Sequence, residues 1–414
     1  MPIFELTIDR LAHTGEGIGT LDGRAVFVEG ALPFERVRAA VTQGKVLRGE
    51  LLEVLTANPA RRTPACPLAD RCGGCDWLHF DERAQREAKQ QAVIAALDHL
   101  GGIAPGTYQQ LPMVSGAQAM GYRRRAVMHA ANGGLGFFGR RSHERVRVDN
   151  CPALTAGLAT LPKRLGELLA SVSTDLEELR LLESGGRVAV ALVLKKPPRP
   201  KVRQAAEELL AGKLVHGVVL VVPNGALEAF GEVELHDGET LLRPELFAQA
   251  NAEVNAELVR SAISLLAPAK HERVLELFSG NGNFTLPLSR AAKEVVAVES
   301  SRGSVALGQK AARAAGVGNL RWIEGDALKT AKGLSAEAQF DCLLLDPPRT
   351  GAPGIAAVAR QVGARRVLYV ACDAAALARD AKELAQHGYE PKTLQVFDLF
   401  PQTQHTETIF LWAR

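Results

Sequence analysis

RVLELFSGNGNFTLPLS, residues 273–289, is the stretch that decides the fold of the C-terminal part of this chain. Its apolar run ends in a turn with Gly280 and Gly282, which permit a tight bend and close approach of the backbone to a ligand. Four further short runs rich in valine and leucine follow, separated by helix-like stretches: EVVAVE, LRWIEG, FDCLLLD and RRVLYVA. Such alternation is typical of buried parallel strands, so the sequence from about residue 270 predicts a doubly wound α/β domain.

Two carboxylates follow the next strands of this pattern. Glu299 ends the second strand, where a carboxylate is placed to accept both hydroxyls of a ribose, and Asp326 follows the third, within reach of an adenine amino group. The turn lacks the third glycine of the dinucleotide fingerprint and the Lys-Ser/Thr pair of a P-loop, which disfavours NAD and ATP. An ordinary βα turn is the alternative, but the context favours a site for an adenosine without a pyrophosphate, such as S-adenosylmethionine.

The fourth and fifth strands bring two further candidate residues to the same edge of the sheet. LLLDPPRTG, residues 343–351, ends the fourth strand, and its two prolines stiffen the turn that fixes Asp346. YVACDAAALARD, residues 369–380, ends the fifth strand in Cys372, whereas Cys342 lies within a strand and is expected to be buried and inert. Most free cysteines only pack, so Cys372 is either a core residue or a nucleophile beside the cofactor turn.

Methylation at carbon 5 of a pyrimidine is the chemistry that needs such a thiol. Methylation of an exocyclic amine uses a lone pair already present, and it typically has Asn rather than Asp before the prolines. Carbon 5 becomes nucleophilic only after a thiolate adds to carbon 6, and a base must then remove the carbon-5 proton. DLFPQTQHTETIFLW, residues 398–412, offers Glu407 and His405 as that base, and the sequence alone does not separate them.

The composition limits the other possibilities. At 414 residues the chain is too long for one core, which predicts two or three domains. Because 49 Lys and Arg face 46 Asp and Glu, the net charge is only +3, and any surface for nucleic acid must be local. The N-terminus has no leader-like pattern and no apolar stretch is as long as a membrane span, so we expect a cytoplasmic protein without a membrane segment.

The N-terminal part predicts a small barrel followed by a helix. Residues 1–57 contain short strand-like runs separated by turn signals, including Asp22-Gly23, and such barrels often carry oligonucleotides. A purely structural barrel fits this pattern equally well. DERAQREAKQQAVIAALDHL, residues 81–100, predicts an amphipathic helix that ends at Gly101-Gly102.

Four cysteines and a basic stretch mark the middle of the chain. Cys66, Cys72 and Cys75 follow the spacing C-x5-C-x2-C, and Cys151 lies further along. Four thiolates suit either zinc or an iron–sulfur cluster, although zinc sites usually pair two short knuckles and only one is present.

The basic stretch, residues 121–148, holds seven arginines against one glutamate, interleaved with aromatic residues. This mixture favours contacts with unpaired RNA, and a solvated charged face is the alternative. The arginines are Arg123, Arg124, Arg125, Arg140, Arg141, Arg145 and Arg147.

On these motifs the chain closely resembles the RNA (uracil-5-)-methyltransferase family over nearly its whole length. The segments LFSGNGNFTLPL, DPPRTG, YVACDAAALARD and FPQTQHTE match the family's glycine turn, its DPPR-x-G, its cysteine motif and its FPxTxHxE segment. The resemblance implies that Cys372 is the nucleophile and that Glu407 is the base at carbon 5. Asp373 and Ala374 depart from the family's usual Asn-Pro after the cysteine, which bears on the pocket for the target base.

The same resemblance implies the ligands of two cofactors. For S-adenosylmethionine it implies contacts at Gln249, Phe278, Asn283, Glu299, Asp326 and Asp346. For a [4Fe–4S] cluster it implies the ligands Cys66, Cys72, Cys75 and Cys151. The N-terminal segment resembles a TRAM domain, a small RNA-binding barrel.

We therefore expect a multi-domain α/β protein: an OB-like TRAM β-barrel over residues 1–57, a central α+β iron–sulfur domain over 58–245, and a Rossmann-like methyltransferase domain over 246–414. The helix at 81–101 is expected to pack on the last of these despite its early position. The expected activity is methyl transfer from S-adenosylmethionine to carbon 5 of a uridine, in 23S ribosomal RNA first and transfer RNA second, with no obligate protein partner. The rivals are a radical-SAM methylthiotransferase, whose usual spacing is C-x3-C-x2-C, and a non-enzymatic RNA-binding protein.

Overall fold

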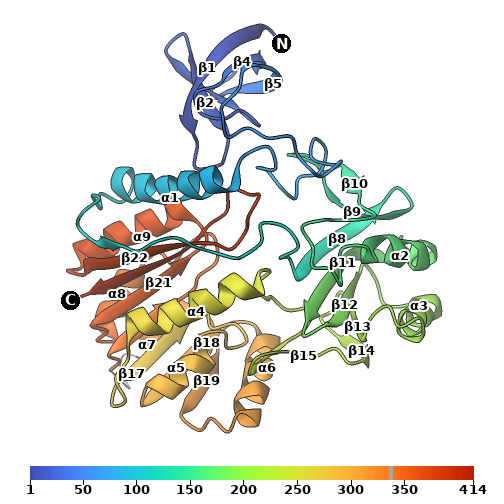
Figure 1. Cartoon of the computed structure of the whole chain (residues 1–414). Helices are drawn as coiled ribbons and strands as arrows, with labels where there is room; N and C mark the ends of the chain where they lie inside the picture. The colour runs from blue at the N-terminus through green and yellow to red at the C-terminus, as the bar shows by residue number, and fades with distance from the viewer. Residues whose placement is uncertain (335–338) are drawn as a thin grey trace.

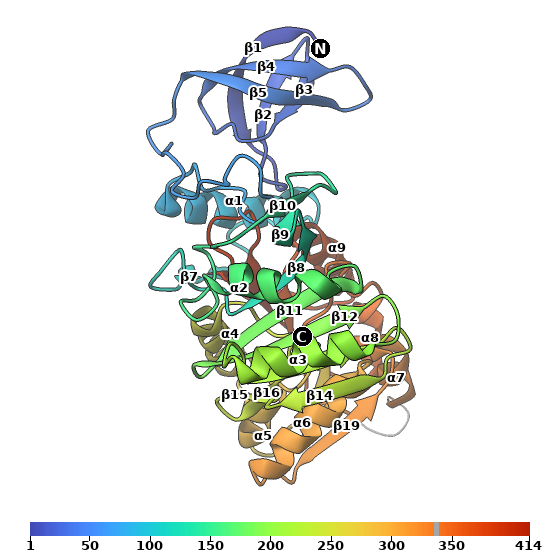
Figure 2. The same ribbon diagram turned by 90° about the vertical axis from the view of Figure 1, so that its right-hand side faces the viewer.

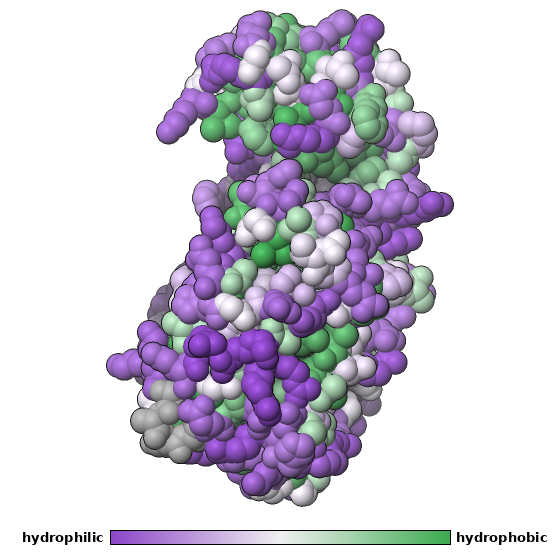
Figure 3. All heavy atoms as spheres, turned by 90° about the vertical axis from the view of Figure 1, so that its left-hand side faces the viewer, coloured by the Kyte–Doolittle hydropathy of each residue, from purple (hydrophilic) through white to green (hydrophobic). Residues whose placement is uncertain are grey.

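A computed structural model describes residues 1–334 and 339–414, and it arranges the chain as a barrel, a central sheet and a larger C-terminal sheet (Figure 1). The barrel is closed, with strand order β1-β2-β3-β5-β4, as the strand pattern predicted. Asp22 and Gly23 form the predicted two-residue turn, and both have positive φ, which matches the twist of the flanking strands. Figure 3 shows the barrel as a separate lobe joined to the rest of the molecule by a narrower waist. Its strands are β1 (Ile3–Leu11), β2 (Gly17–Leu21), β3 (Arg24–Val28), β4 (Arg36–Thr42) and β5 (Leu47–Thr56).

The central part is a seven-stranded sheet in the order β10-β9-β8-β11-β12-β13-β14. Helices α2 and α3 cover one of its faces (Figure 2), because their apolar sides share one core with the strands. The strands are β8 (Arg125–Ala131), β9 (Gly134–Phe138), β10 (Arg145–Arg147), β11 (Leu176–Ser184), β12 (Arg187–Leu194), β13 (Gly217–Val221) and β14 (Leu227–Gly231). The helices are α2 (Leu161–Leu168), the 3-10 turn η1 (Ala170–Val172) and α3 (Pro200–Ala211), and a small ribbon of β15 (Leu235–Asp237) and β16 (Thr240–Leu242) leads into the last part.

The C-terminal part is the predicted doubly wound domain. Its sheet runs β19-β18-β17-β20-β21-β23-β22-β6, with β7 also paired to β22, and the strands from β17 to β21 are parallel. The order reverses between β17 and β20, and open α/β sheets bind ligands at the carboxyl ends of strands at such a point. The strands are β6 (Gln109–Gln110), β7 (Val114–Ser115), β17 (Arg273–Leu277), β18 (Glu294–Glu299), β19 (Leu320–Glu324), β20 (Cys342–Leu345), β21 (Arg366–Ala371), β22 (Glu390–Asp398) and β23 (Glu407–Ala413).

Helices cover both faces of this sheet. One face packs with α4 and α5, and the other with α1, α7, α8 and α9, as the two apolar cores show. The helices are α1 (Glu82–His99), α4 (Ala252–Leu266), α5 (Thr285–Ala291), α6 (Arg302–Ala314), α7 (Ala327–Leu334), α8 (Ile355–Gln361) and α9 (Ala374–Gln386). No helix in the described part of the chain has the length and apolar character needed to cross a bilayer.

Helix α1 precedes the central sheet in the sequence but packs beside α9 of the C-terminal part (Figure 1). Asp81 caps its first turn, since its side chain accepts from the backbone N–H groups of Arg83 and Ala84. Further along, the Lys89 ammonium donates to Asp398 Oδ1 at 2.6 Å and to the Phe400 carbonyl at 2.9 Å, and Lys89 and Asp398 are almost fully buried. This ion pair joins residues 309 positions apart and ties the helix to the end of β22.

We expect Asp398→Leu to lower the free energy of unfolding by about 3–5 kcal/mol, because it leaves the Lys89 charge buried and uncompensated. The double variant Lys89→Met/Asp398→Leu should recover most of that loss, since it removes both charges. Urea denaturation of the single and double variants measures both effects, and a double variant as unstable as the single one would contradict this account.

Candidate active site

The strand register brings the predicted site residues to one edge of the C-terminal sheet. Leu277, at the end of β17, pairs with Leu345 of β20, so the glycine turn and Asp346 leave neighbouring strands together. In the antiparallel pair of β21 and β23, Ala371 pairs with Thr408. The next residues outward are Cys372 on one strand and Glu407 on the other, so the thiol and the carboxylate lie side by side.

The glycine turn is organised around Glu299. One carboxylate oxygen of Glu299 accepts from the Gly280 N–H at 3.0 Å, and the other accepts from the Ser301 N–H at 2.7 Å. Gly282 has φ of +103°, and a Cβ there would lie 3.2 Å from the Trp322 ring, so both conformation and space require glycine. The carboxylate at the end of β18 therefore lies directly beside the turn, as the sequence predicted.

The other candidate cofactor residues have partners within the protein. Asn283 and Asn255 exchange two amide hydrogen bonds of 2.9 and 3.0 Å. Gln249 is buried, and its carbonyl accepts from Arg124 Nε at 2.9 Å. Asp326 accepts from the Lys329 N–H at 2.8 Å in the first turn of α7. These contacts fix the positions of the three side chains, and they leave the role of each toward a cofactor as a prediction.

Phe278 and Asp346 complete the set of cofactor candidates. Phe278 follows β17 directly with φ of +60°, a left-handed conformation that is uncommon for a residue with a side chain and that marks the start of the turn. Burial raises the pKa of Asp346 to about 7, so this carboxyl group holds a proton far more readily than an exposed aspartate. Its position between the glycine turn and the thiol lets its charge act on both.

Cys372 lies immediately before helix α9 and is half-buried. Burial, followed by the nearby Glu407 and Asp346 carboxylates, raises the pKa of its thiol to about 12, and Arg349 acts in the opposite direction. Asp373, one of the departures from the family pattern, caps α9 by accepting from the Ala376 N–H at 2.8 Å. The N-terminus of α9 and Arg349 favour negative charge at Cys372, but burial and the two carboxylates outweigh them, so the thiol keeps its proton in the ligand-free protein.

Glu407 and His405, the two candidate bases, lie in different surroundings. Glu407 is 3% exposed, and its Oε1 has no hydrogen-bond partner within the described residues. Burial, and then the nearby Asp346, raise its pKa well above that of an exposed glutamate. His405 lies in the loop before β23, where its Nε2 is 3.3 Å from the Arg349 guanidinium, and burial and Arg349 lower its pKa to about 4. A neutral imidazole that meets a guanidinium has its Nε2 occupied, whereas the Glu407 carboxyl has a free oxygen.

Glu276 is a buried carboxyl group at this edge that the motif analysis did not single out. It is 0% exposed in β17, and neither oxygen has a hydrogen bond of good geometry in the described part of the chain, although the Thr285 hydroxyl lies close enough to lower its pKa somewhat. Burial raises its pKa to about 8, and Asp346 and Glu299 act in the same direction. The signal for it was a charged residue inside the apolar run RVLEL, since glutamate is almost never fully buried without a partner.

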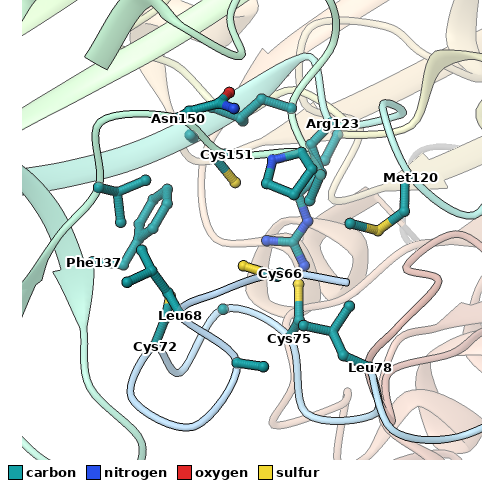
Figure 4. Close-up of a pocket in the computed structure, with 18 of the residues that line it drawn as sticks. Cys66, Leu68, Cys72, Cys75, Leu78, Met120, Arg123, Phe137, Asn150 and Cys151 are labelled. Atoms are coloured by element: carbon teal, nitrogen blue, oxygen red, sulfur yellow. The ribbon is translucent and has the colours of Figure 1, made fainter. Parts of the chain in front are cut away.

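The four cysteines Cys66, Cys72, Cys75 and Cys151 line one cavity of about 280 Å³ between the cysteine-bearing loop and the central sheet. Figure 4 shows the sulfur atoms of Cys66, Cys75 and Cys151 turned into the same space, with the Arg123 guanidinium alongside. Burial raises the pKa of Cys75 to about 12, and the neighbouring thiols act in the same direction. The four thiols share this cavity without being drawn together closely enough to hold one metal ion, and the same is true of every other group of His, Cys, Asp or Glu side chains within residues 1–334 and 339–414.

The arginine-rich stretch, residues 121–148, lies in part where the central sheet meets the barrel, and its contact with RNA stays a prediction. Most of its guanidinium groups have partners within the protein: Arg124 pairs with Asp237, Arg140 with Glu29, Arg141 with Glu16 and Glu29, and Arg147 with Asp149. Glu16 and Glu29 belong to the barrel, so these arginines join the barrel to the central sheet. The sequence did not predict these ion pairs, because the barrel carboxylates lie more than 100 positions earlier in the chain.

The parallel sheet, its glycine turn and the carboxylate beside that turn define a class of protein, the Rossmann-like S-adenosylmethionine-dependent methyltransferases. Comparison with known proteins narrows this class. Residues 241–414 match the family described as tRNA (Uracil-5-)-methyltransferase, and residues 3–52 match the TRAM domain.

The chain is similar along almost its whole length to enzymes named 23S rRNA (uracil(1939)-C(5))-methyltransferase RlmD. The relative from Pseudomonas putida is 36% identical over 98% of this chain and 93% of its own length. The relative from Alkalilimnicola ehrlichii is 36% identical over 99% of this chain and 96% of its own length. The chain therefore belongs to the RNA (uracil-5-)-methyltransferase family, and it is an S-adenosylmethionine-dependent methyltransferase with a TRAM domain at its N-terminus.

A solved structure has the same fold. The Pyrococcus abyssi tRNA (uracil-54, C5)-methyltransferase, in complex with S-adenosyl-L-homocysteine, superposes with a TM-score of 0.76 over 99% of this chain and 100% of that chain. Its sequence is 20% identical, so the likeness concerns the fold alone.

We expect the ligand-free protein to lose stability as the pH rises from about 4 to about 8. Glu276 and Asp346 have pKa values raised in the folded state to about 8 and about 7. Both carboxyl groups bind protons more tightly in the folded protein than in the unfolded chain. The stability that this adds is complete below their pKa in the unfolded chain, and it is lost as the pH rises through their pKa in the folded protein. Thermal midpoints measured across this range should fall, and Glu276→Gln should flatten the fall.

Glu207→Gln, at an exposed position of α3, is the matched control for this experiment and should keep the pH dependence of the wild type. If Glu276→Gln also keeps the full slope, the carboxyl group of Glu276 is ionised in the folded protein and the assignment is wrong.

Proposed function

We propose that this enzyme methylates carbon 5 of a uridine in 23S ribosomal RNA, with Cys372 as nucleophile and Glu407 as base. The observation that carries the proposal is the register of β21 and β23, because the pairing of Ala371 with Thr408 leaves Cys372 and Glu407 adjacent at the cofactor edge. Methyl transfer to an exocyclic amine needs no thiol at this position, whereas addition to a pyrimidine ring needs both a thiolate and a base.

The proposed chemistry uses each group in turn. S-adenosylmethionine, when bound, supplies a methyl group on a sulfonium whose positive charge also favours ionised carboxylates around it. The Cys372 thiol first loses its proton to solvent, a step that Arg349 and the α9 N-terminus favour. Its Sγ then bonds to carbon 6 of the uracil, and the ring electrons move toward O4. Carbon 5 then takes the methyl group, while the bond from that methyl to the sulfonium sulfur breaks and its electron pair stays on a neutral thioether. Glu407 accepts the proton from carbon 5, the bond between carbon 6 and sulfur breaks, and the thiolate leaves.

The crevice proposed for the cofactor is lined by the residues that the sequence singled out. Glu299 already accepts hydrogen bonds from the glycine turn, where ribose hydroxyls would meet the same carboxylate. Gln249, Phe278, Asn283, Asp326 and Asp346 are proposed as the further contacts. Because the uracil must be attacked from above its plane, the target has to be an unpaired or extruded base.

The choice of 23S ribosomal RNA is supported by the curated relatives, which carry that substrate in their names and align along nearly the full chain. Transfer RNA is the second candidate, since the matching family description names it.

The test is methyl transfer from labelled S-adenosylmethionine to undermethylated total RNA, separated by RNA class and digested for 5-methyluridine. We expect label in 23S RNA as 5-methyluridine, no product and no adduct with Cys372→Ala, and an accumulated covalent RNA adduct with Glu407→Gln. Cys342→Ala, at the other cysteine of this domain, is the matched control and should remain active. Label in transfer RNA would reject 23S ribosomal RNA as the substrate. An active Cys372→Ala enzyme would reject Cys372 as the nucleophile. Formation of 5′-deoxyadenosine would instead favour a radical-SAM methylthiotransferase.

We further propose that Cys66, Cys72, Cys75 and Cys151 hold a [4Fe–4S] cluster. The support is the donor set, since four thiols line one cavity, and its volume of about 280 Å³ exceeds what a single ion needs. A cluster spreads its four iron atoms over such a space, whereas one zinc ion would draw every sulfur to about 2.3 Å from itself. With four protein ligands no iron is left open, so the proposed role is to hold the cysteine-bearing loop against the central sheet.

Iron and acid-labile sulfide measured on protein purified without oxygen test the cluster. We expect four of each per chain, as the proposed composition requires, and a loss of both, with a lower melting temperature, in Cys75→Ser. Cys342→Ser should keep both, because that thiol is buried elsewhere. A wild-type protein that lacks iron and yet melts at the same temperature as Cys75→Ser would reject the proposed cluster.

A further inference from the structure

The loop between β22 and β23, residues 399–406, contains a residue in a strained conformation. Gln402 has φ of +66°, in the left-handed region that residues with a side chain rarely adopt. Such conformations persist only where the surroundings over-determine them, and they cluster at functional sites. This loop leads directly into Glu407, and its His405 meets Arg349 of the DPPR turn.

The backbone and side chain of Gln402 are held from outside the loop. Its N–H donates to Gln85 Oε1 at 3.0 Å, and its carbonyl accepts from the Trp77 N–H at 2.9 Å. Its side-chain oxygen accepts from Gln85 Nε2 at 2.9 Å, and its own Nε2 donates to Glu82 Oε1 at 3.1 Å. Both backbone groups and both ends of the amide are therefore satisfied by residues more than 300 positions earlier in the chain.

Gln85 is the centre of this arrangement. It is 0% exposed, and besides its two contacts with Gln402 its Nε2 lies 3.0 Å from the Trp77 carbonyl and 2.8 Å from the Phe80 carbonyl. Lys89, one turn further along α1 on the same face, holds the start of the same loop through Asp398 and Phe400. A buried amide with this many partners holds both its own orientation and that of Gln402, because each partner restricts the movement of the amide in a different direction.

We propose that Gln85 is a positioning residue for the proposed methyl transfer: it holds Gln402 in the left-handed conformation and thereby keeps His405 and the start of β23 in place beside Cys372. The proposal rests on the function proposed above. Without the Gln85 amide, nothing on the α1 side accepts from the Gln402 N–H, and the backbone of Gln402 can relax to negative φ. A change of this backbone torsion moves the residues that follow it, and misplacement by about 1 Å can cost about 100-fold in rate.

The decisive variant is Gln85→Leu, which keeps the approximate size of the side chain and removes the amide. We expect kcat to fall by about 10- to 100-fold, while KM for RNA and for S-adenosylmethionine stays within about twofold, because the loop acts on the reacting groups. Gln91→Leu, at an exposed position of the same helix, is the matched control and should behave as the wild type. A fall in kcat no larger than in Gln91→Leu, or a rise in KM for RNA with kcat unchanged, would overturn the proposal.

A double-variant cycle separates positioning from general loss of structure. Glycine has no preference against positive φ, so Gln402→Gly removes the strain that Gln85 has to hold. In the Gln402→Gly background, Gln85→Leu should cost less in kcat than it costs alone. If the loss of kcat in the double variant equals the sum of the losses in the two single variants, expressed as free energies, Gln85 does not act through the conformation of Gln402.

Hydrogen exchange over residues 399–406 tests the clamp without RNA. We expect faster exchange of this segment in Gln85→Leu and unchanged exchange in Gln91→Leu. If Gln85→Leu fails to fold, Gln85→Glu keeps the acceptor for the Gln402 N–H and loses the amide donor, and an intermediate exchange rate is expected. Unchanged exchange in a folded variant overturns the clamp, whereas faster exchange with no uracil methylation by the wild type rejects the proposed function alone.

Discussion

The site depends on one property of the sheet: β23 runs opposite to the strands on its β21 side. Parallel strands all end at the same edge, so the residues that follow them gather there. An antiparallel strand inserted beside them begins at that edge, and Glu407, the first residue of β23, therefore meets Cys372, the first residue after β21. The carboxyl group and the thiol are 35 positions apart in the sequence, and neither a local motif nor helix periodicity connects them. Only the pairing of β21 with β23 brings them together.

The electrostatics of this edge follow from burial. Glu276, Asp346 and Glu407 are carboxyl groups in surroundings that disfavour charge, and a charge on Asp346 further raises the pKa of the other two. A ligand that brings positive charge into the crevice relieves all three at once, whereas a neutral adenosine does not. The raised pKa values of these carboxyl groups therefore favour a cationic cofactor, in addition to any hydrogen bonds that the site offers.

The sequence was informative where structure is local. The alternation of apolar runs predicted the parallel strands, Asp22-Gly23 predicted its turn, and the closed barrel and the α/β sheet are confirmed. The ion pairs of Arg140 and Arg141 could not be predicted from the sequence, because their barrel carboxylates are more than 100 residues away. Gln85 gave no signal at all, since its partners lie at the other end of the chain and glutamine on a helix is usually a surface residue. The separation of Glu407 from His405 likewise needed the hydrogen bond of His405 with Arg349, a contact between two turns.

The position of α1 in the chain has a consequence for synthesis. Lys89 and its partner Asp398 are 309 residues apart, so at about 5–20 residues per second the ribosome makes the partner roughly 15–60 s after the lysine. During that interval α1 has no finished sheet to pack on and its buried amine has no counter-ion. The sheet therefore closes only when the last strand is made: a chain that stops before the end of β22 lacks the partner of Lys89, and one that stops before β23 lacks the strand that pairs with both β21 and β22.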